Sequence, residues 1–154
     1  MPETYILFFD VDKPYSPADI SIATKKCYAQ AFAEDIPIFF QCGVSVPLHK
    51  ILAGRCTEAC TAFISTDSMP SVPNIRRLPP GLTVSTYHLG NYYKIESSYM
   101  RLVEYCRAND LEIISDSYEF CINDYVTSRN EDEFITKILF YVRKGRSSGA
   151  MSTL

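Results

Sequence analysis

The sequence predicts an α+β domain of two related halves, each with the order strand, helix, strand, strand. The chain has 154 residues, of which 47% are hydrophobic and 21% charged, the size and composition of one globular domain. Each half holds one stretch with apolar residues at helical spacing and several β-prone runs. Residues 67–81 contain four prolines, which disfavour a helix or a central strand, so we expect a linker there.

The first half is expected over about residues 4–66. Ser16 lies before Pro17 and three residues before Asp19, which is typical of a helix start, and apolar residues then recur at helical spacing. The predicted elements are a strand over 5–11, a helix over 17–34, and strands over 38–46 and 59–65, with a hairpin connection over 47–58.

The second half, about residues 82–144, repeats this order. A strand is predicted over 82–89, a helix over 91–109, and strands over 118–122 and 134–142, with a polar loop over 123–133. The ends of the two predicted helices are also similar in sequence, 33–36 (Ala-Glu-Asp-Ile) and 108–111 (Ala-Asn-Asp-Leu). We interpret residues 145–154 as a flexible tail.

Each half has about 75 residues and would gain stability by pairing with the other. We therefore expect two pseudo-symmetric modules that form a mostly antiparallel sheet of about six to eight strands. Both helices are expected on one face of this sheet. A ligand groove is expected on the other face, at the pseudo-twofold axis.

Charge and composition argue against several classes of protein. The net charge of −3 provides no surplus of basic residues for phosphates, so we expect no nucleic-acid binding by this chain alone. No apolar run reaches the ~18 residues of a membrane span, and the acidic N-terminus is unlike a signal peptide, so we expect a cytoplasmic location. The six cysteines are expected to be free thiols, and neither a metal nor a cofactor is predicted.

The second half contains four motifs: 78–81 (Leu-Pro-Pro-Gly), 87–92 (Tyr-His-Leu-Gly-Asn-Tyr), 117–120 (Ser-Tyr-Glu-Phe) and 134–138 (Phe-Ile-Thr-Lys-Ile). Together they resemble the GyrI-like family, which includes the effector-binding domains of BmrR-type multidrug-sensing bacterial regulators. Asn91 and Lys137 depart from the family pattern, in which Pro and Glu are usual at these points. The fold that this resemblance implies is two strand-helix-strand-strand modules, in agreement with the repeat described above.

Glu119 is the principal candidate for a functional residue. It interrupts an apolar strand and lies on the strand face opposite to Tyr118 and Phe120, where a carboxylate is costly to desolvate unless it is paired. An edge-strand glutamate that faces water is the alternative on the residues alone. The resemblance implies instead a position at the floor of a ligand pocket, facing the cation of a lipophilic drug.

Tyrosine side chains are the second group of candidates, because a flat ring with a hydroxyl suits a hydrophobic cation. Tyr92 and Tyr93 lie at the start of the second helix, and Tyr15 lies at the matching point of the first half, so pseudo-symmetry would place them on opposite sides of a groove. Cys121 and Tyr141 complete the predicted ligand-binding set. No catalytic residue is predicted, and a role in local backbone bonding is expected for His88.

The leading hypothesis is a domain that binds a hydrophobic, cationic small molecule. It would be the effector-sensing part of a transcriptional regulator, with a DNA-binding domain or partner protein outside this chain, or a free-standing relative. One alternative is a hydrolase of reactive natural products that uses the pocket glutamate as general base. Another is a protein inhibitor of the gyrase-inhibitor type.

Overall fold

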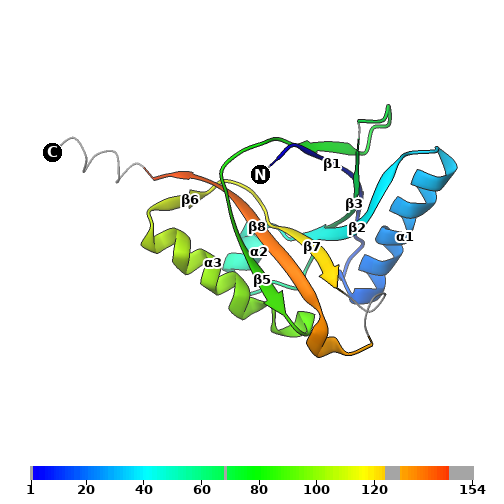
Figure 1. Ribbon diagram of the computed structural model, residues 1–154. Coiled ribbons are helices and arrows are strands. Elements are labelled where there is room, and N and C mark those ends of the chain that lie inside the picture. Colours follow the sequence, from blue (N-terminus) through cyan, green and yellow to red (C-terminus); the bar gives the residue numbers. More distant parts are fainter. Residues whose placement is uncertain (1, 68, 124–128, 146–154) are drawn as a thin grey trace.

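The computed structural model describes residues 2–67, 69–123 and 129–145, and Figure 1 shows one sheet with α1 and α3 on either side of its centre. The sheet has eight strands, and its strand pairs are antiparallel, which confirms the predicted class. The elements are β1 (Thr4–Asp10), α1 (Pro17–Ala33), β2 (Ile38–Ser45), α2 (Leu48–Leu52), β3 (Thr61–Thr66), β4 (Ile75–Leu78), β5 (Thr83–Leu89), the 3-10 turn η1 (Tyr92–Lys94), α3 (Glu96–Ala108), β6 (Leu111–Ile113), β7 (Tyr118–Asn123), the 3-10 turn η2 (Glu131–Glu133) and β8 (Ile135–Lys144).

The strand order shows the predicted twofold arrangement of two modules. The order β4-β1-β3-β2-β7-β8-β5 places β1-β3-β2 of the first half beside β7-β8-β5 of the second. The halves join where β2 pairs with β7, with Gly43 opposite Phe120 and Val44 opposite Glu119. Gly43 is required at this junction, because an added Cβ would lie 2.1 Å from the Glu119 carbonyl oxygen.

The two helices begin and end alike, which supports the internal repeat. Asp35 and Asp110, just beyond the ends of α1 and α3, both have a φ of 52°. At the beginnings, Ser16 caps α1 through the backbone N–H of Asp19, and Asn91 caps η1 through that of Tyr93. The same spacing along the chain separates Ser16 from Asn91 and Asp35 from Asp110. The short sequence match at the helix ends therefore corresponds to equivalent structure.

Three short elements depart from the sequence prediction. The linker over 67–81 contains β4, which pairs with β1 at the edge of the sheet; its prolines, including Pro73 and Pro79, lie outside the strand. The expected hairpin connection over 47–58 contains α2, which places Ile51 in the core. β6 follows α3 and pairs with β8. The second helix is also divided, because the 3-10 turn η1 comes before α3.

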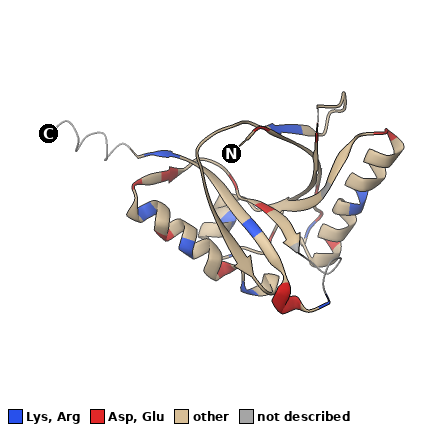
Figure 2. Cartoon of the chain, in the orientation of Figure 1, with Lys and Arg blue, Asp and Glu red and all other residues tan. Residues whose placement is uncertain are grey.

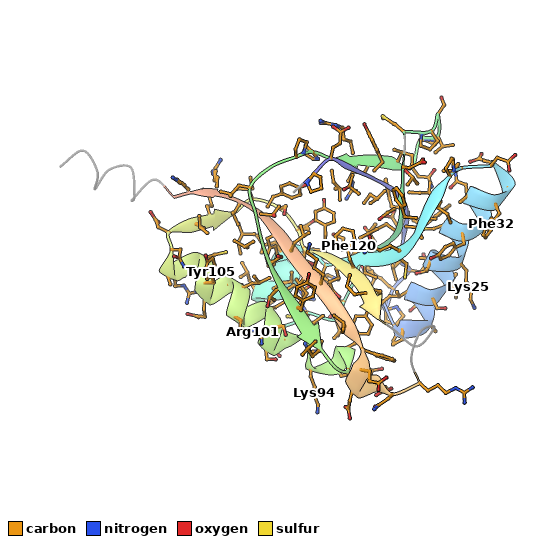
Figure 3. The ribbon with its side chains drawn as sticks, viewed as in Figure 1. Lys25, Phe32, Lys94, Arg101, Tyr105 and Phe120 are labelled. Carbon is orange, nitrogen blue, oxygen red and sulfur yellow. The ribbon has the colours of Figure 1, made fainter. Side chains whose placement is uncertain are left out.

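Both faces of the sheet are packed, and both helices lie on one of them, as predicted. Ala23 of α1 and Tyr99 of α3 belong to the same core cluster as Val44 and Phe140. Lys25 and Phe32 on α1 point away from the sheet (Figure 3), whereas Arg101 of α3 donates hydrogen bonds to Thr86 and Tyr87 of β5. None of the described helices has the length and apolar character of a membrane span. The predicted tail lies outside the described residues beyond Gly145.

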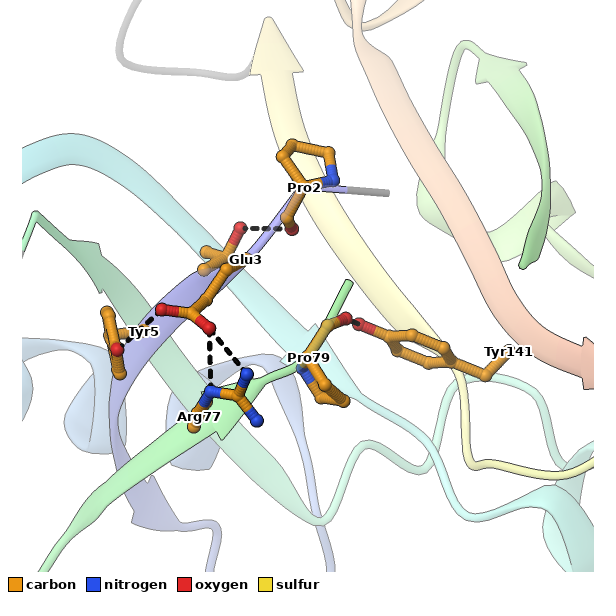
Figure 4. Close-up of polar contacts among 7 residues, drawn as sticks. Pro2, Glu3, Tyr5, Arg77, Pro79 and Tyr141 are labelled. Atoms are coloured by element: carbon orange, nitrogen blue, oxygen red, sulfur yellow. Dashed lines mark hydrogen bonds and ion pairs between the residues drawn. The ribbon is translucent and has the colours of Figure 1, made fainter. Parts of the chain in front are cut away.

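The opposite face of the sheet holds a second apolar cluster, in which Phe63 packs edge-on against Tyr118 and Phe120. Tyr141 belongs to this face, and its hydroxyl donates a hydrogen bond to the carbonyl oxygen of Pro79 at 2.7 Å (Figure 4). Figure 4 also shows Arg77 of β4 donating to the Glu3 carboxylate, which ties β4 to the start of the chain. This face is thus filled by its own aromatic side chains.

Candidate ligand-binding site

A cavity of about 470 Å³ lies between the beginnings of α1 and η1, over the β2–β7 junction. Its position corrects one expectation: the groove is at the pseudo-twofold axis as predicted, but on the helical face of the sheet. Glu119 and Cys121 of β7 line it, whereas their neighbours Tyr118 and Phe120 pack on the other face. Alternation along β7 separates these two sets, but it does not indicate which set faces the helices.

The α1 side of the cavity is formed by the turn before the helix. Tyr15 lies there with a φ of 65°, directly before the cap Ser16. The ammonium of Lys50 lies 3.9 Å from the centre of the Tyr15 ring and 3.0 Å from a carboxylate oxygen of Glu58. One face of the Tyr15 ring is therefore already in contact with a cation, and the Glu58 charge at the cavity wall is paired.

The opposite side is formed by η1. The Asn91 side chain accepts a hydrogen bond from the backbone N–H of Tyr93 at 2.8 Å, and His88 holds the same turn, because its Nε2 lies 2.7 Å from the Asn91 carbonyl oxygen. This is the predicted local role of His88. The Tyr92 hydroxyl lies 3.0 Å from Cys121 Sγ, and the Tyr93 side chain is 74% exposed at the mouth.

Glu119 forms the polar part of the floor, and it is only 2% exposed. Burial raises the pKa of its carboxyl group to about 7, although a hydrogen bond from the Tyr99 hydroxyl acts in the opposite direction. None of the ion pairs among the described residues involves Glu119. The floor therefore combines an apolar surface with a carboxylate that has no basic partner in this part of the chain.

The acidic character of the lining extends to the mouth. The described lining residues include Glu58, Glu119 and Glu131 and contain no lysine, arginine or histidine. Glu131 belongs to η2, whose acidic residues are coloured red near the start of α3 in Figure 2, and it accepts a hydrogen bond from the Asn91 amide at 2.8 Å. Of these three, Glu58 is paired with Lys50, so the acidic character of the described lining rests on Glu119 and Glu131.

The structure brings five of the six predicted site residues to one cavity: Glu119, Tyr92, Tyr93, Tyr15 and Cys121. Tyr141 is not among them, because residues of β8 alternate between the faces and its ring lies with Tyr118 on the other one. That any of these residues contacts a ligand stays a prediction.

Sequence reasoning missed the contacts of Tyr99 and Lys50. Helical periodicity places Tyr99 on the buried side of α3, but it cannot show that the Tyr99 hydroxyl meets Glu119. Lys50 reaches the Tyr15 ring from α2. No signal in the sequence pointed to this helix.

Solved structures with the same fold include the C-terminal domain of EcmrR. The crystal structure of the EcmrR C-terminal domain is similar over 94% of this chain and 94% of that chain, with a TM-score of 0.70 and 17% identity. EcmrR in its cryo-EM complex with DNA gives a TM-score of 0.67 at 16% identity, and the match covers 94% of this chain but 55% of that one.

A protein from Listeria innocua described as a hydrolase is also similar, with a TM-score of 0.58 and 11% identity over 92% of this chain and 88% of that one. At these identities the structural matches show the fold alone. No curated protein matches the sequence. The model of the GyrI-like small molecule binding domain matches residues 1–143, and the chain therefore belongs to the GyrI-like family.

Proposed function

We propose that the chain binds a lipophilic, cationic small molecule in the cavity between α1 and η1, with Glu119 facing the positive charge. One observation carries this proposal: Glu119 is a buried carboxylate at an apolar floor, without a basic partner among the described residues. A cation gains a pairing interaction in a medium of low dielectric, whereas an anion would lie against a like charge. The volume of about 470 Å³ is in the range of cavities that hold drug-sized ligands.

In this proposal the domain is a sensor, which binds its ligand and releases it unchanged. The domain would report the presence of such compounds to a DNA-binding domain or partner protein outside this chain, or act as a free-standing binding protein. The similarity in fold to the EcmrR C-terminal domain supports this role.

The decisive experiment is fluorescence titration with a cationic, a neutral and an anionic dye of similar size. The wild-type protein should bind the cationic dye most tightly, and Glu119→Gln should lose that preference. Glu112→Gln is the matched control, because it removes an equal charge from exposed β6, where Glu112 pairs with Arg143. Equal affinities of the folded Glu119→Gln and Glu112→Gln proteins for the cationic dye would contradict the proposal.

A second candidate function is hydrolysis of a reactive small molecule. The pKa of about 7 at Glu119 suits a general base at neutral pH, and one protein of similar fold is described as a hydrolase. Mass spectrometry of the ligand after incubation separates the two functions. A sensor returns its ligand unchanged, whereas an enzyme yields product that Glu119→Gln does not form.

A further inference from the structure

A pair of thiols lies at the β2–β7 junction, on the floor of the cavity. The antiparallel register places Gly43 opposite Phe120 and Val44 opposite Glu119, and one further step places Cys42 opposite Cys121. Cys42 pairs with Ile64 of β3 and Cys121 pairs with Thr136 of β8, and the irregularities of both strands begin just beyond these pairs, at 39–41 and at 122. Residues directly opposite in such a pair have Cβ atoms about 4.5–5.5 Å apart.

Both thiols face the cavity. Cys42 and Cys121 line it together, on the same strand faces as Val44 and Glu119, and both are half-buried. The Tyr92 hydroxyl lies 3.0 Å from Cys121 Sγ, so a polar hydrogen is within reach of one sulfur atom. The two sulfur atoms are therefore accessible from the same space and close enough for one atom to bridge them.

The other four cysteines are placed less favourably for such chemistry. Cys56 also lines the cavity, but it is buried, and burial raises the pKa of its thiol to about 11. Cys27 and Cys106 are buried, and burial raises the pKa of the Cys27 thiol to about 12. Cys60 is half-buried but is not among the lining residues.

We propose that Cys42 and Cys121 form a dithiol subsite for monosubstituted trivalent arsenicals, with the organic substituent held in the apolar cavity. The described residues form no group of three or more His, Cys, Asp or Glu side chains that could hold a metal ion. A trivalent arsenical needs only two protein sulfur atoms, because its third bond goes to its own carbon substituent. Soft thiolate ligands suit such a soft centre.

The reaction balances without an oxidant. The hydrated arsenical R–As(OH)₂ exchanges its two As–O bonds for two As–S bonds to Cys42 and Cys121. Each thiol loses its proton to a departing hydroxide, and two water molecules leave. Arsenic stays trivalent and neither sulfur changes oxidation state.

Phenylarsine oxide provides the test, with full-length protein that has been reduced and transferred to buffer free of thiols. We expect one arsenical per chain by intact mass spectrometry and the loss of two reactive thiols in the native protein. Cys42→Ser and Cys121→Ser should each reduce the apparent affinity by about 10²–10⁴-fold, because a second, intramolecular bond is lost. Cys60→Ser is the matched control and should bind as tightly as the wild type.

Capture by the two serine variants with wild-type affinity would overturn the proposal, and so would an adduct mapped to other cysteines. If either serine variant fails to fold, the wild-type adduct decides: protease digestion and mass mapping must find arsenic linked to the peptides that contain both Cys42 and Cys121. The readout is covalent capture, so it does not depend on whether the cavity prefers cationic dyes.

Discussion

Tyr99 of α3 donates a hydrogen bond to the carboxylate of Glu119 on β7, at the bottom of the cavity. The same hydroxyl lies 2.8 Å from Ser117 Oγ, and both Tyr99 and Glu119 are buried. This bond favours the ionised carboxylate, but desolvation outweighs it, and the pKa of Glu119 is raised to about 7. Near neutral pH, Glu119 is therefore divided between its charged and uncharged forms.

Binding of a cationic dye should depend on pH through Glu119. Only the ionised carboxylate attracts the cation, so affinity should fall as the pH drops below about 7, by up to about tenfold for each pH unit. Affinity should become constant above the pKa. Titrations of a permanently charged dye between pH 5.5 and 8.5 test this. A neutral dye should show no such dependence, and a flat profile for the cationic dye would argue against Glu119 as its partner.

The stability of the protein should respond to the same group with a defined sign. The pKa of Glu119 is higher in the folded protein, about 7, than its ordinary value of 4.5. The folded state therefore holds the proton more tightly, and the contribution of Glu119 to stability is lost as the pH rises from about 4.5 to 7. Glu119→Gln does not titrate, so it should match the wild type near pH 4.5 and be more stable above pH 7, by up to about 3 kcal/mol.

Urea unfolding of both proteins at several pH values measures this difference, and the other titrating groups cancel in the comparison. A constant difference in unfolding free energy across this range would show that Glu119 keeps an ordinary pKa in the folded protein.

Removal of the Tyr99 hydroxyl should act on Glu119 without changing the cavity wall. In Tyr99→Phe the carboxylate loses its donor, so its pKa should rise above the present value. The midpoint of the pH profile for cation binding should move to higher pH, and affinity at pH 7 should fall. We also expect a loss of about 1–3 kcal/mol in unfolding free energy, because buried polar atoms lose a partner. An unchanged midpoint in a folded protein would contradict the coupling.

Local patterns predicted much of the fold. The start of α1 followed from Ser16, Pro17 and Asp19, and the structure shows the expected reciprocal cap, in which Ser16 and Asp19 bond each other's backbone N–H groups. The internal repeat could be detected in the sequence because both helices end in the same way. Asp35 and Asp110, just beyond these ends, both have the left-handed backbone conformation. These features depend on neighbouring residues, which the sequence places together.

The parts that could not be predicted depend on distant residues. β4 is a strand because β1 lies beside it, and its four residues show no pattern of their own. The face that carries the cavity was also beyond the sequence, because both faces of β7 are covered, one by Phe63 and the other by the helices. Glu119 was identified as a candidate because a carboxylate in an apolar strand needs an explanation, but its donor Tyr99 comes from packing.

The junction between the modules gives a prediction about stability. In Gly43→Ala the new methyl group would meet the Glu119 carbonyl oxygen at 2.1 Å and the Phe63 ring at 2.5 Å, so β2 and β7 would have to separate. We expect a loss of about 1–3 kcal/mol or more in unfolding free energy. Gly81→Ala is the control, because its added Cβ would meet only the Tyr141 ring at 3.3 Å. Equal stabilities of the two variants would indicate a looser junction.

The tyrosines at the mouth should contribute to affinity through contact area instead of charge. Tyr93 is 74% exposed beside the cavity, and Tyr15 lines the opposite side with one ring face against Lys50. Tyr93→Ala should weaken cationic and neutral dyes of the same shape by similar factors, with a loss of about 0.5–1.5 kcal/mol for each. Tyr15→Ala should do the same, although it also leaves Lys50 without its ring contact.

The control for these variants is Tyr105→Ala, which removes a 54% exposed ring of α3 that is not among the lining residues of the cavity. It should leave both dyes unaffected. The contrast with Glu119→Gln is the informative result, because that variant should weaken the cationic dye alone, by about 2–4 kcal/mol at most. If Tyr93→Ala and Tyr15→Ala changed only the cationic dye, the rings would act through cation–π attraction rather than contact area. If neither variant changed either dye, the ligand would bind away from the space between α1 and η1.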